Sequence, residues 1–423
     1  MLPYDTSLID NQAVIGILRR AYNHVDQRLM DHGIRVSYVV SRLLQKLPQV
    51  APVQLRDICF LAAMHDVGAY KTEEIDRMVQ FETESIWDHS IYGYLFVKNF
   101  TPLAELAPAV LFHHTPWSKL KALDGVSGDS NYVAQLISIA DRLDIWMNMQ
   151  GRPFSGFLAQ IRTERDRRFR ADIVDRMAEE AFSAFSAEDA EKDPGFQRMQ
   201  AQSTFTHEEM RSYLRMIIFT IDFRSRHTVT HTMTTTSLSN ELALHMGLDP
   251  EYRNQIIAGA ILHDLGKIGI PVEILEYPGK LTPQAMKVMR THVDITEEIL
   301  GGDIPAPIRN IALRHHEKLN GSGYPRGLTA EDLTVGERIV ALADIISALA
   351  GTRSYKKAYG KERILSIIAQ MRDDGQLDAD LVDCMVAHYD GMMEKTCRQC
   401  LPILDVYEQV QAEYRSLHAR YTT

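Results

Sequence analysis

The chain has 423 residues, of which 45% are hydrophobic and 24% charged, a composition typical of a globular protein with two or three domains. Its net charge of −10 argues against a surface that binds duplex nucleic acid through release of counterions. The first residues lack the basic patch and apolar core of a signal peptide, and no run approaches the roughly 18 apolar residues of a membrane span. We therefore expect a cytoplasmic protein without a membrane or duplex nucleic acid partner.

Helical periodicity runs along nearly the whole chain. Apolar residues recur at three- and four-residue spacing in segments such as 13–30, 54–64, 131–147, 213–223, 254–262 and 335–350. Alternating patterns that end in hairpin turns are scarce. Thr282-Pro283 predicts the start of a helix, and Asn320-Gly321 predicts the end of the helix that carries His315 and His316. These patterns predict an all-α protein.

An internal repeat of metal-ligating residue types organises the chain. The first half carries His32, His65, Asp66, His89, His113, His114 and Asp141. The second half carries His231, His263, Asp264, His292, His315, His316 and Asp344. The first histidine precedes the His-Asp pair by 33 residues in one half and by 32 in the other. Ten of the sixteen histidines occupy these positions, so the spacing indicates a duplicated site rather than scattered core histidines.

These residue types predict metal binding. Any one of these histidines alone would more often be a core residue, but imidazole and carboxylate ligands together suit iron, manganese or zinc. Five histidines and two aspartates exceed the needs of one ion and fit two, with an aspartate as the bridge. Two ions about 3.5–4 Å apart can activate a bridging hydroxide and hydrolyse a phosphodiester without a serine or cysteine nucleophile. The histidine content favours iron or manganese over magnesium.

Several motifs of the second half occur in the order seen in one bacterial enzyme family. They are HDLGKIGIP at 263–271, PGKLT at 278–282, His292, HHEKLNGSGYP at 315–325 and TRSYK at 352–356. Over residues 224–390 the chain resembles the HD-GYP phosphodiesterases. The resemblance implies hydrolysis of c-di-GMP, 3′,3′-cGAMP or a related 3′–5′ cyclic dinucleotide to a linear dinucleotide. It also implies two tandem HD-type helical domains, an N-terminal HD-like domain at 1–198 and an HD-GYP domain at 199–423.

The resemblance also implies the roles of individual residues. One metal would be held by His231, His263, Asp264 and Asp344, and Asp264 would bridge to a second, completed by His292, His315 and His316. Lys267 would face the scissile phosphate and act in catalysis with Asp264. Arg353 and Lys356 would contact the other phosphate, although a solvated surface pair is the alternative for them. Tyr324, in the Gly-Tyr-Pro loop, would line the substrate pocket or a surface for a signalling protein.

The chain departs from the family pattern at a few positions. Some members have a glutamate four residues before the first histidine, where it helps to hold a third metal, and here that residue is His227. A third metal is therefore left open, with His227 as a candidate ligand. Asn320 and Ser354 also differ from the usual residues, which could alter the nucleotide preference but leaves the ligand set intact.

The first half keeps all seven ligand-type residues, so metal binding there is left open. Ala69 stands where Lys267 stands in the second half, and no Gly-Tyr-Pro loop follows His113 and His114. We therefore expect a regulatory, non-catalytic domain, which could also support a homodimer. Two further functions remain open for the chain as a whole: an inactive sensor of cyclic dinucleotides, and an HD phosphohydrolase acting on another nucleotide.

The cysteines indicate no disulfide framework. The chain has four, Cys59, Cys384, Cys397 and Cys400. The last two form a C-x-x-C, but a zinc site would need a second ligand pair, for which only His388 and His418 are near. Reduced thiols are the expectation.

Overall fold

The computed structural model describes residue 9 and residues 11–24, 31–45, 51–69, 87–123, 125, 127–183, 185–202, 205–224, 230–277, 279–351 and 359–422. In these residues every regular element is a helix, apart from two isolated β-bridges. The predicted all-α class is therefore confirmed. None of the described helices combines the length and the apolar character needed to cross a membrane.

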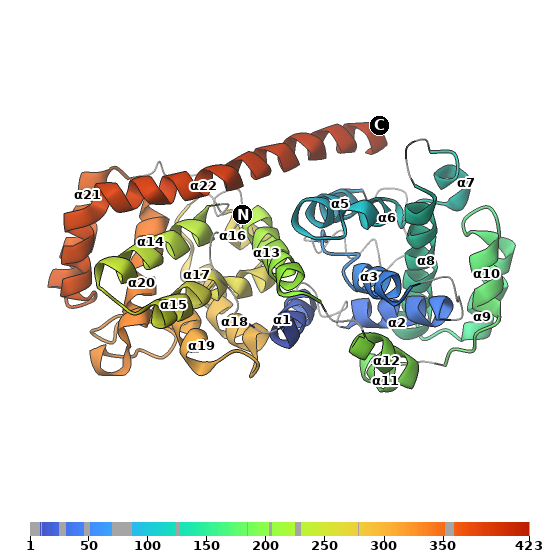
Figure 1. The fold of residues 1–423 in the computed structure, drawn as a ribbon, viewed down its shortest axis with the longest axis horizontal. Coiled ribbons are helices and arrows are strands. Elements are labelled where there is room, and N and C mark those ends of the chain that lie inside the picture. The colour runs from blue at the N-terminus through green and yellow to red at the C-terminus, as the bar shows by residue number, and fades with distance from the viewer. Residues whose placement is uncertain are drawn as a thin grey trace. The chain divides into compact units, whose positions relative to one another are not determined.

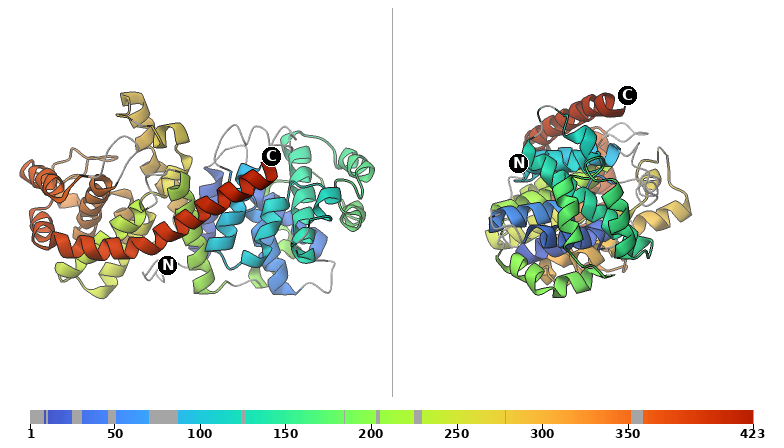
Figure 2. Two further views of the ribbon diagram at one scale, coloured as in Figure 1. Left: turned by 90° about the horizontal axis from the view of Figure 1, so that it is seen from above. Right: turned by 90° about the vertical axis from the view of Figure 1, so that its right-hand side faces the viewer.

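The chain divides into two compact units (Figure 1). The C-terminal unit comprises Met1–His24 and Tyr213–Gln411, and the N-terminal unit comprises Val25–Ser212 and Ala412–Thr423. The expected domains were residues 1–198 and 199–423. In the structure, Met1–His24 belong to the C-terminal unit and Ala412–Thr423 belong to the N-terminal unit. The long helix α22 (Ala379–Thr422), which Figure 2 shows as one continuous element, therefore contributes residues to both.

The C-terminal unit is a helical domain around one apolar core. Its other helices are α1 (Asn11–Asn23), α13 (His207–Arg224, from Tyr213 onward), α14 (His231–His245), α15 (Pro250–Leu262), η4 (Leu265–Gly269), α16 (Val272–Leu275), α17 (Pro283–Arg290), α18 (His292–Leu300), α19 (Ala306–Leu313), η5 (Ala330–Asp332), α20 (Val335–Ala350) and α21 (Lys361–Asp373). Leu238 and Leu242 of α14, Ile256 of α15 and Ile339 of α20 are fully buried in this core. The core therefore fixes the relative positions of α14, α15 and α20.

Helix α1 completes this unit from the beginning of the chain. Its residues Val14, Ile17 and Leu18 are buried, and the helix packs against α18. Arg20 donates hydrogen bonds to the carbonyls of Ile299 (2.6 Å) and Leu300 (3.1 Å) at the end of α18. These carbonyls have no partner within their own helix, so Arg20 closes the C-terminal end of α18.

The N-terminal unit repeats the same arrangement. Its helices are α2 (His32–Leu44), α3 (Pro52–Ala63), α5 (Asp88–Phe100), η2 (Ala104–Leu106), α6 (Ala107–Phe112), α7 (Trp117–Leu120), α8 (Gly128–Asp144), the π-turn η3 (Ile145–Met149), α9 (Phe154–Thr163), α10 (Ala171–Ala178), α11 (Ala187–Lys192) and α12 (Pro194–Gln202). Helix α2 packs on α3 and α8, as α14 packs on α15 and α20 in the other unit. Helix α6 packs on α5 and α8, as α19 packs on α18 and α20. The sequence repeat is therefore a repeat of five helices.

Two helix boundaries expected from the sequence can be compared with the structure. Thr282 caps α17 ahead of Pro283 as predicted, through a hydrogen bond from the backbone of Ala285. The prediction for His315 and His316 was wrong: α19 ends at Leu313, and both histidines lie in the turn beyond it. A continued helix would point two adjacent side chains about 100° apart, whereas a turn lets both reach one centre.

Candidate metal centre

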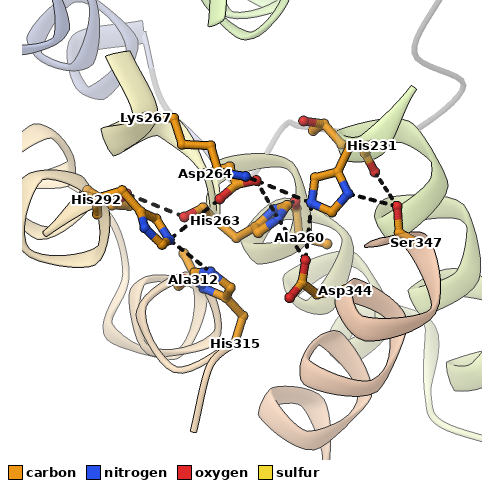
Figure 3. Close-up of polar contacts among 12 residues, drawn as sticks. His231, Ala260, His263, Asp264, Lys267, His292, Ala312, His315, Asp344 and Ser347 are labelled. Atoms are coloured by element: carbon orange, nitrogen blue, oxygen red, sulfur yellow. Dashed lines mark hydrogen bonds and ion pairs between the residues drawn. The ribbon is translucent and has the colours of Figure 1, made fainter. Parts of the chain in front are cut away.

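The seven ligand-type residues of the C-terminal half come together at one place. Figure 3 labels all of them except His316. His231 begins α14, His263 and Asp264 follow α15, and Asp344 lies in α20. The ligand atoms form two groups, each within 4.8 Å: His231, His263 and Asp264 in one, and His292, His315 and His316 in the other. The structure thus assembles residues that lie more than a hundred positions apart in the sequence.

Asp264 stands between the two groups. Its Oδ2 lies 3.3 Å from Nε2 of His231 and 3.2 Å from Nε2 of His263. Its other oxygen, Oδ1, lies 3.6 Å from Nε2 of His292 in the second group. Asp344 Oδ1 lies 3.1 Å from His231 Nε2. One carboxylate oxygen facing each group is the arrangement expected of a bridging ligand.

The second nitrogen of four of the five histidine rings is oriented by a hydrogen bond within the protein. Nδ1 of His263, His292 and His315 lies 2.6–2.7 Å from the carbonyl oxygen three residues earlier, so each Nδ1–H donates to that carbonyl. His231 Nδ1 lies 2.9 Å from the hydroxyl of Ser347. A hydrogen held on Nδ1 leaves the lone pair of Nε2 directed at the centre, as metal-ligating histidines require.

Buried atoms without partners show that this site fits metal ions. Nε2 of His231 and Nε2 of His263 are buried and have no hydrogen-bond partner. A buried polar atom left unpaired is costly, and a bound cation would satisfy both. The donor set of imidazole nitrogens and carboxylate oxygens suits a first-row divalent metal.

The protonation states also fit metal binding. Burial raises the pKa of Asp264, but the neighbouring His263 and Lys267 outweigh it and hold that pKa well below its usual value. Burial lowers the pKa of His316 to about 3 and that of His315 well below its usual value. Burial lowers the pKa of His231, but the neighbouring carboxylates of Asp264 and Asp344 outweigh it and raise that pKa to about 9, so a metal would compete with a proton there.

A glycine in the His-Asp-x-Gly turn brings the two ligand groups together. A Cβ on Gly266 would lie 1.9 Å from the carbonyl oxygen of His292, and one on Gly68 would lie 2.1 Å from that of His89. Neither position can accept a side chain without moving the helix that carries the next histidine. The same close approach in both halves explains why each repeat has glycine there.

Lys267 and the Gly-Tyr-Pro loop lie beside the centre. The ammonium group of Lys267 contacts Asp264, as Figure 3 shows. The ring of Tyr324 lies over that of His316, with centroids 4.6 Å apart. The buried carboxylate of Glu317 accepts hydrogen bonds from the backbone of Arg326 (2.7 Å) and Leu328 (2.9 Å), which anchors the loop.

A cavity of about 610 Å³ opens over the centre. His231, Lys267, His292, His316, Tyr324 and Asp344 line it, together with apolar residues from the segment around α16 and from α22. Four of these wall residues are large hydrophobics left exposed, Tyr277 (48%), Met286 (38%), Leu401 (57%) and Leu404 (38%). The amino-acid sequence did not indicate this wall, because only the folded chain brings residues of α22 to the same cavity as the ligand-type residues.

Three predicted site residues lie outside the described part of the chain. These are His227, Arg353 and Lys356. The cysteine pair does lie in the described part, and both Cys397 and Cys400 line the cavity as free thiols. Among the described residues, no ligand cluster includes them.

The N-terminal half forms a corresponding cluster. One group contains His32, His65 and Asp141, and the other contains Asp66, His89, His113 and His114. Asp66 Oδ2 lies 3.4 Å from His65 Nε2, while Oδ1 lies 3.7 Å from His113 Nε2. Asp66 therefore stands between two groups, as Asp264 does.

Comparison with known families matches both halves of the chain to HD domains. The HD domain family matches residues 29–146, and a second HD domain family matches residues 198–381. The chain contains two HD domains. Both matches include the ligand residues of their own half, from His32 to Asp141 and from His231 to Asp344.

Curated relatives of this tandem HD protein are phosphodiesterases. It is 28% identical over 389 residues to the 3′3′-cGAMP-specific phosphodiesterase 1 of Vibrio cholerae, covering 87% of this chain and 89% of the relative. It is 36% identical over 207 residues to the cyclic di-GMP phosphodiesterase response regulator RpfG of Xanthomonas campestris, covering 48% of this chain and 54% of RpfG. The resemblance to the HD-GYP family is therefore confirmed.

A solved structure has the same fold. The crystal structure of a cyclic GMP-AMP specific phosphodiesterase of V. cholerae, V-cGAP3, matches with a TM-score of 0.54 and 16% identity. The match covers 89% of this chain and 97% of V-cGAP3. At this identity the match supports the tandem fold and no more.

Proposed function

We propose that this protein is a metal-dependent phosphodiesterase whose C-terminal HD domain opens a 3′–5′ cyclic dinucleotide to a linear dinucleotide. The observation that carries the proposal is Asp264, placed between two groups of buried ligand atoms. A cavity lined by His231, His292 and Asp344 of the same centre opens beside it. The curated relatives named above act on 3′3′-cGAMP and cyclic di-GMP and support this class of substrate. We place the reaction in the cytoplasm, where such signalling nucleotides occur.

Two divalent ions, iron or manganese, would be held by the two ligand groups. His231, His263, Asp264 and Asp344 would hold one ion, and Asp264, His292, His315 and His316 the other. When bound, such a pair supplies a hydroxide nucleophile near neutral pH and neutralises charge on the phosphate.

Lys267 is positioned to act on the phosphate. It lines the cavity beside Asp264 and places a positive charge next to the centre. In this position its ammonium group can stabilise negative charge on the non-bridging oxygens and donate a proton to the leaving 3′ oxygen. Asp264 has the second role of keeping Lys267 in place.

The volume of the cavity suits a small-molecule ligand such as a cyclic dinucleotide. Small-molecule sites commonly have volumes of about 300–1,000 Å³, and this cavity of about 610 Å³ lies within that range. The exposed rings and aliphatic side chains at its wall offer surfaces on which bases can pack. We expect Tyr324 to contribute to this wall, and Arg353 and Lys356 to contact the phosphate that is not cleaved.

The tandem architecture favours 3′,3′-cGAMP as the first substrate to test. The 3′3′-cGAMP-specific relative aligns along most of both chains, including the N-terminal HD domain, whereas the alignment with RpfG covers about half of each. c-di-GMP remains the second candidate. A homodimer and a signalling partner at the loop around Tyr324 remain predictions.

The test is a product assay on full-length protein loaded anaerobically with Fe(II) or Mn(II). The protein is offered 3′,3′-cGAMP, c-di-GMP and c-di-AMP separately, and products are identified by mass spectrometry. We expect a linear dinucleotide from 3′,3′-cGAMP, c-di-GMP or both, and none from the Asp264→Ala variant. Absence of any product from metal-loaded protein would contradict the proposal and favour a sensor of these nucleotides.

A further inference from the structure

The N-terminal cluster differs from the C-terminal one next to the last aspartate. The segments ISIADRLD and VALADIIS correspond, so Arg142 follows Asp141 where Ile345 follows Asp344. Ile345 packs against the hydrophobic core of its unit. Arg142 is 1% exposed, which is unusual for a residue that is always charged.

The guanidinium of Arg142 is directed at the ligand cluster. Its Nε lies 3.2 Å from Oδ2 of Asp141, and its Nη2 lies 3.0 Å from Nδ1 of His114. The corresponding ring nitrogen in the other half, Nδ1 of His316, lies 3.5 Å from a carboxylate oxygen of Asp344. The two equivalent histidines therefore face groups of opposite charge.

This difference decides which nitrogen of His114 carries hydrogen. A guanidinium only donates hydrogen bonds, so Nδ1 of His114 must accept, and in the neutral ring the hydrogen then sits on Nε2. His114 Nε2 lies 3.1 Å from Nε2 of His89, to which it can donate. His114 then has no lone pair to offer a metal, and the nearby positive charge opposes a second cation.

The other group of the N-terminal cluster, which contains His32, His65 and Asp141, offers ligand atoms that can bind an ion. Nε2 of His32, Nε2 of His65 and both oxygens of Asp66 are buried without hydrogen-bond partners. His32 Nδ1 lies 2.7 Å from Asp144 Oδ2, and His65 Nδ1 lies 2.8 Å from the carbonyl oxygen of Ala62, so both rings are oriented with Nε2 inward. Asp141 Oδ1 lies 3.5 Å from His32 Nε2. Two imidazoles and two carboxylates are enough for one divalent metal.

We propose that the N-terminal HD domain binds a single divalent metal ion through His32, His65, Asp66 and Asp141, and that Arg142 disables the second position. A lone ion beside Ala69 lacks both the partner ion and the lysine of the other half, so its role is structural. The proposal concerns the N-terminal ligands alone and does not depend on the activity of the C-terminal domain.

The experiment counts metal per chain. Full-length protein is loaded anaerobically with Mn(II), desalted and analysed by inductively coupled plasma mass spectrometry, with folding checked by circular dichroism. We expect the double variant His65→Ala/Asp66→Ala to hold one ion fewer than the wild type. No loss would show that the N-terminal half binds no metal, and a loss of two ions would show a dinuclear centre; either result overturns the proposal.

Three single-residue variants distinguish one N-terminal ion from two, independently of the double variant. His114→Ala should leave the metal count unchanged, whereas the equivalent His316→Ala should lower it. Arg142→Ile, which restores the residue of the other half, should raise the count by one ion and make the Mn(II) EPR signal of the N-terminal site that of a coupled pair. A loss of metal in His114→Ala would overturn the proposal even if Arg142→Ile failed to fold. Product formation is measured separately, so an inactive enzyme would leave these counts interpretable.

Discussion

The two HD domains share a scaffold and a ligand set, yet they place their positive charge differently. In the C-terminal domain the cation is Lys267, which lines the cavity next to Asp264. In the N-terminal domain that position is Ala69, and the cation is Arg142, which enters from α8 and contacts a ligand histidine. Two sites with the same ligand-type residues can therefore differ in function. On the proposals above, the residues next to the ligands decide whether a site binds two ions and acts on a substrate.

A second difference concerns the residue that orients the first histidine. Ser347 contacts His231 in the C-terminal domain, whereas Asp144 contacts His32 in the N-terminal domain. Asp144 also accepts hydrogen bonds from Arg35 at 2.6 and 3.0 Å. The N-terminal domain thus contains a buried network of ion pairs at this position, which suits a stabilising role.

The largest expected effect comes from removing the bridging aspartate of each domain. Asp264→Ala should abolish metal binding at its centre and reduce turnover by roughly a thousandfold or more, since it removes both a ligand and charge stabilisation. Asp66→Ala should leave most of the turnover. Steady-state product formation is the measurement. An Asp66→Ala protein that is folded yet as inactive as Asp264→Ala would show that the division of labour is wrong.

Lys267→Ala should lower kcat by roughly a hundredfold, the usual contribution of a positioned proton donor, while the metal count stays unchanged. Lys287→Ala is the control, because this lysine lies in the neighbouring helix α17 and does not line the cavity. A loss of metal in Lys267→Ala would contradict the role as proton donor and would show that the lysine acts only by holding Asp264 in place.

Asp144→Ala should destabilise the protein by about 3–5 kcal/mol, since it removes a fully buried carboxylate that pairs with both Arg35 and His32. Ser347→Ala, its counterpart, should cost about 1 kcal/mol. Burial raises the pKa of Asp144, but His32 and Arg35 outweigh it and lower that pKa below the unfolded value. The contribution of Asp144 to the free energy of unfolding is therefore present above about pH 4, and it falls as the pH drops towards the pKa of Asp144 in the folded protein. Metal-free unfolding at pH 7 and pH 3 tests this, and an equal difference at both would contradict it.

The smallest effect is expected at the cavity wall. Leu404→Ala should raise KM by roughly fivefold, equivalent to about 1 kcal/mol of lost apolar contact, without changing kcat. Val386→Ala is a matched control, because it is an exposed apolar residue of the same helix that does not line the cavity. Equal KM values for the two variants would place the substrate elsewhere.

The sequence predicted the helical class and the two repeated sets of His and Asp residues that the structure brings together, because both depend on local periodicity and on the spacing between helix ends. The role of these residues as metal ligands stays a prediction. It could not predict the cavity wall, since Leu401 and Leu404 approach the ligands only through the packing of α22. Arg142 was also missed: beside Asp141 it looks like an ordinary helix residue, and only its burial shows which side it faces. The role of Ser347 could have been inferred, because it lies one turn after Asp344 on the same helix.

The position of helix α1 in the sequence also affects how the protein folds during its synthesis. Arg20 and its partner Ile299 are 279 residues apart, so α1 leaves the ribosome long before the helix it packs against exists. At about 5–20 residues per second, its apolar face waits roughly 15–55 s, while the intervening domain is synthesised. During that time α1 is a candidate for capture by chaperones. For the same reason, a recombinant fragment that begins at residue 199 should expose the buried face of α18 and require α1, supplied as a fused segment, to be soluble.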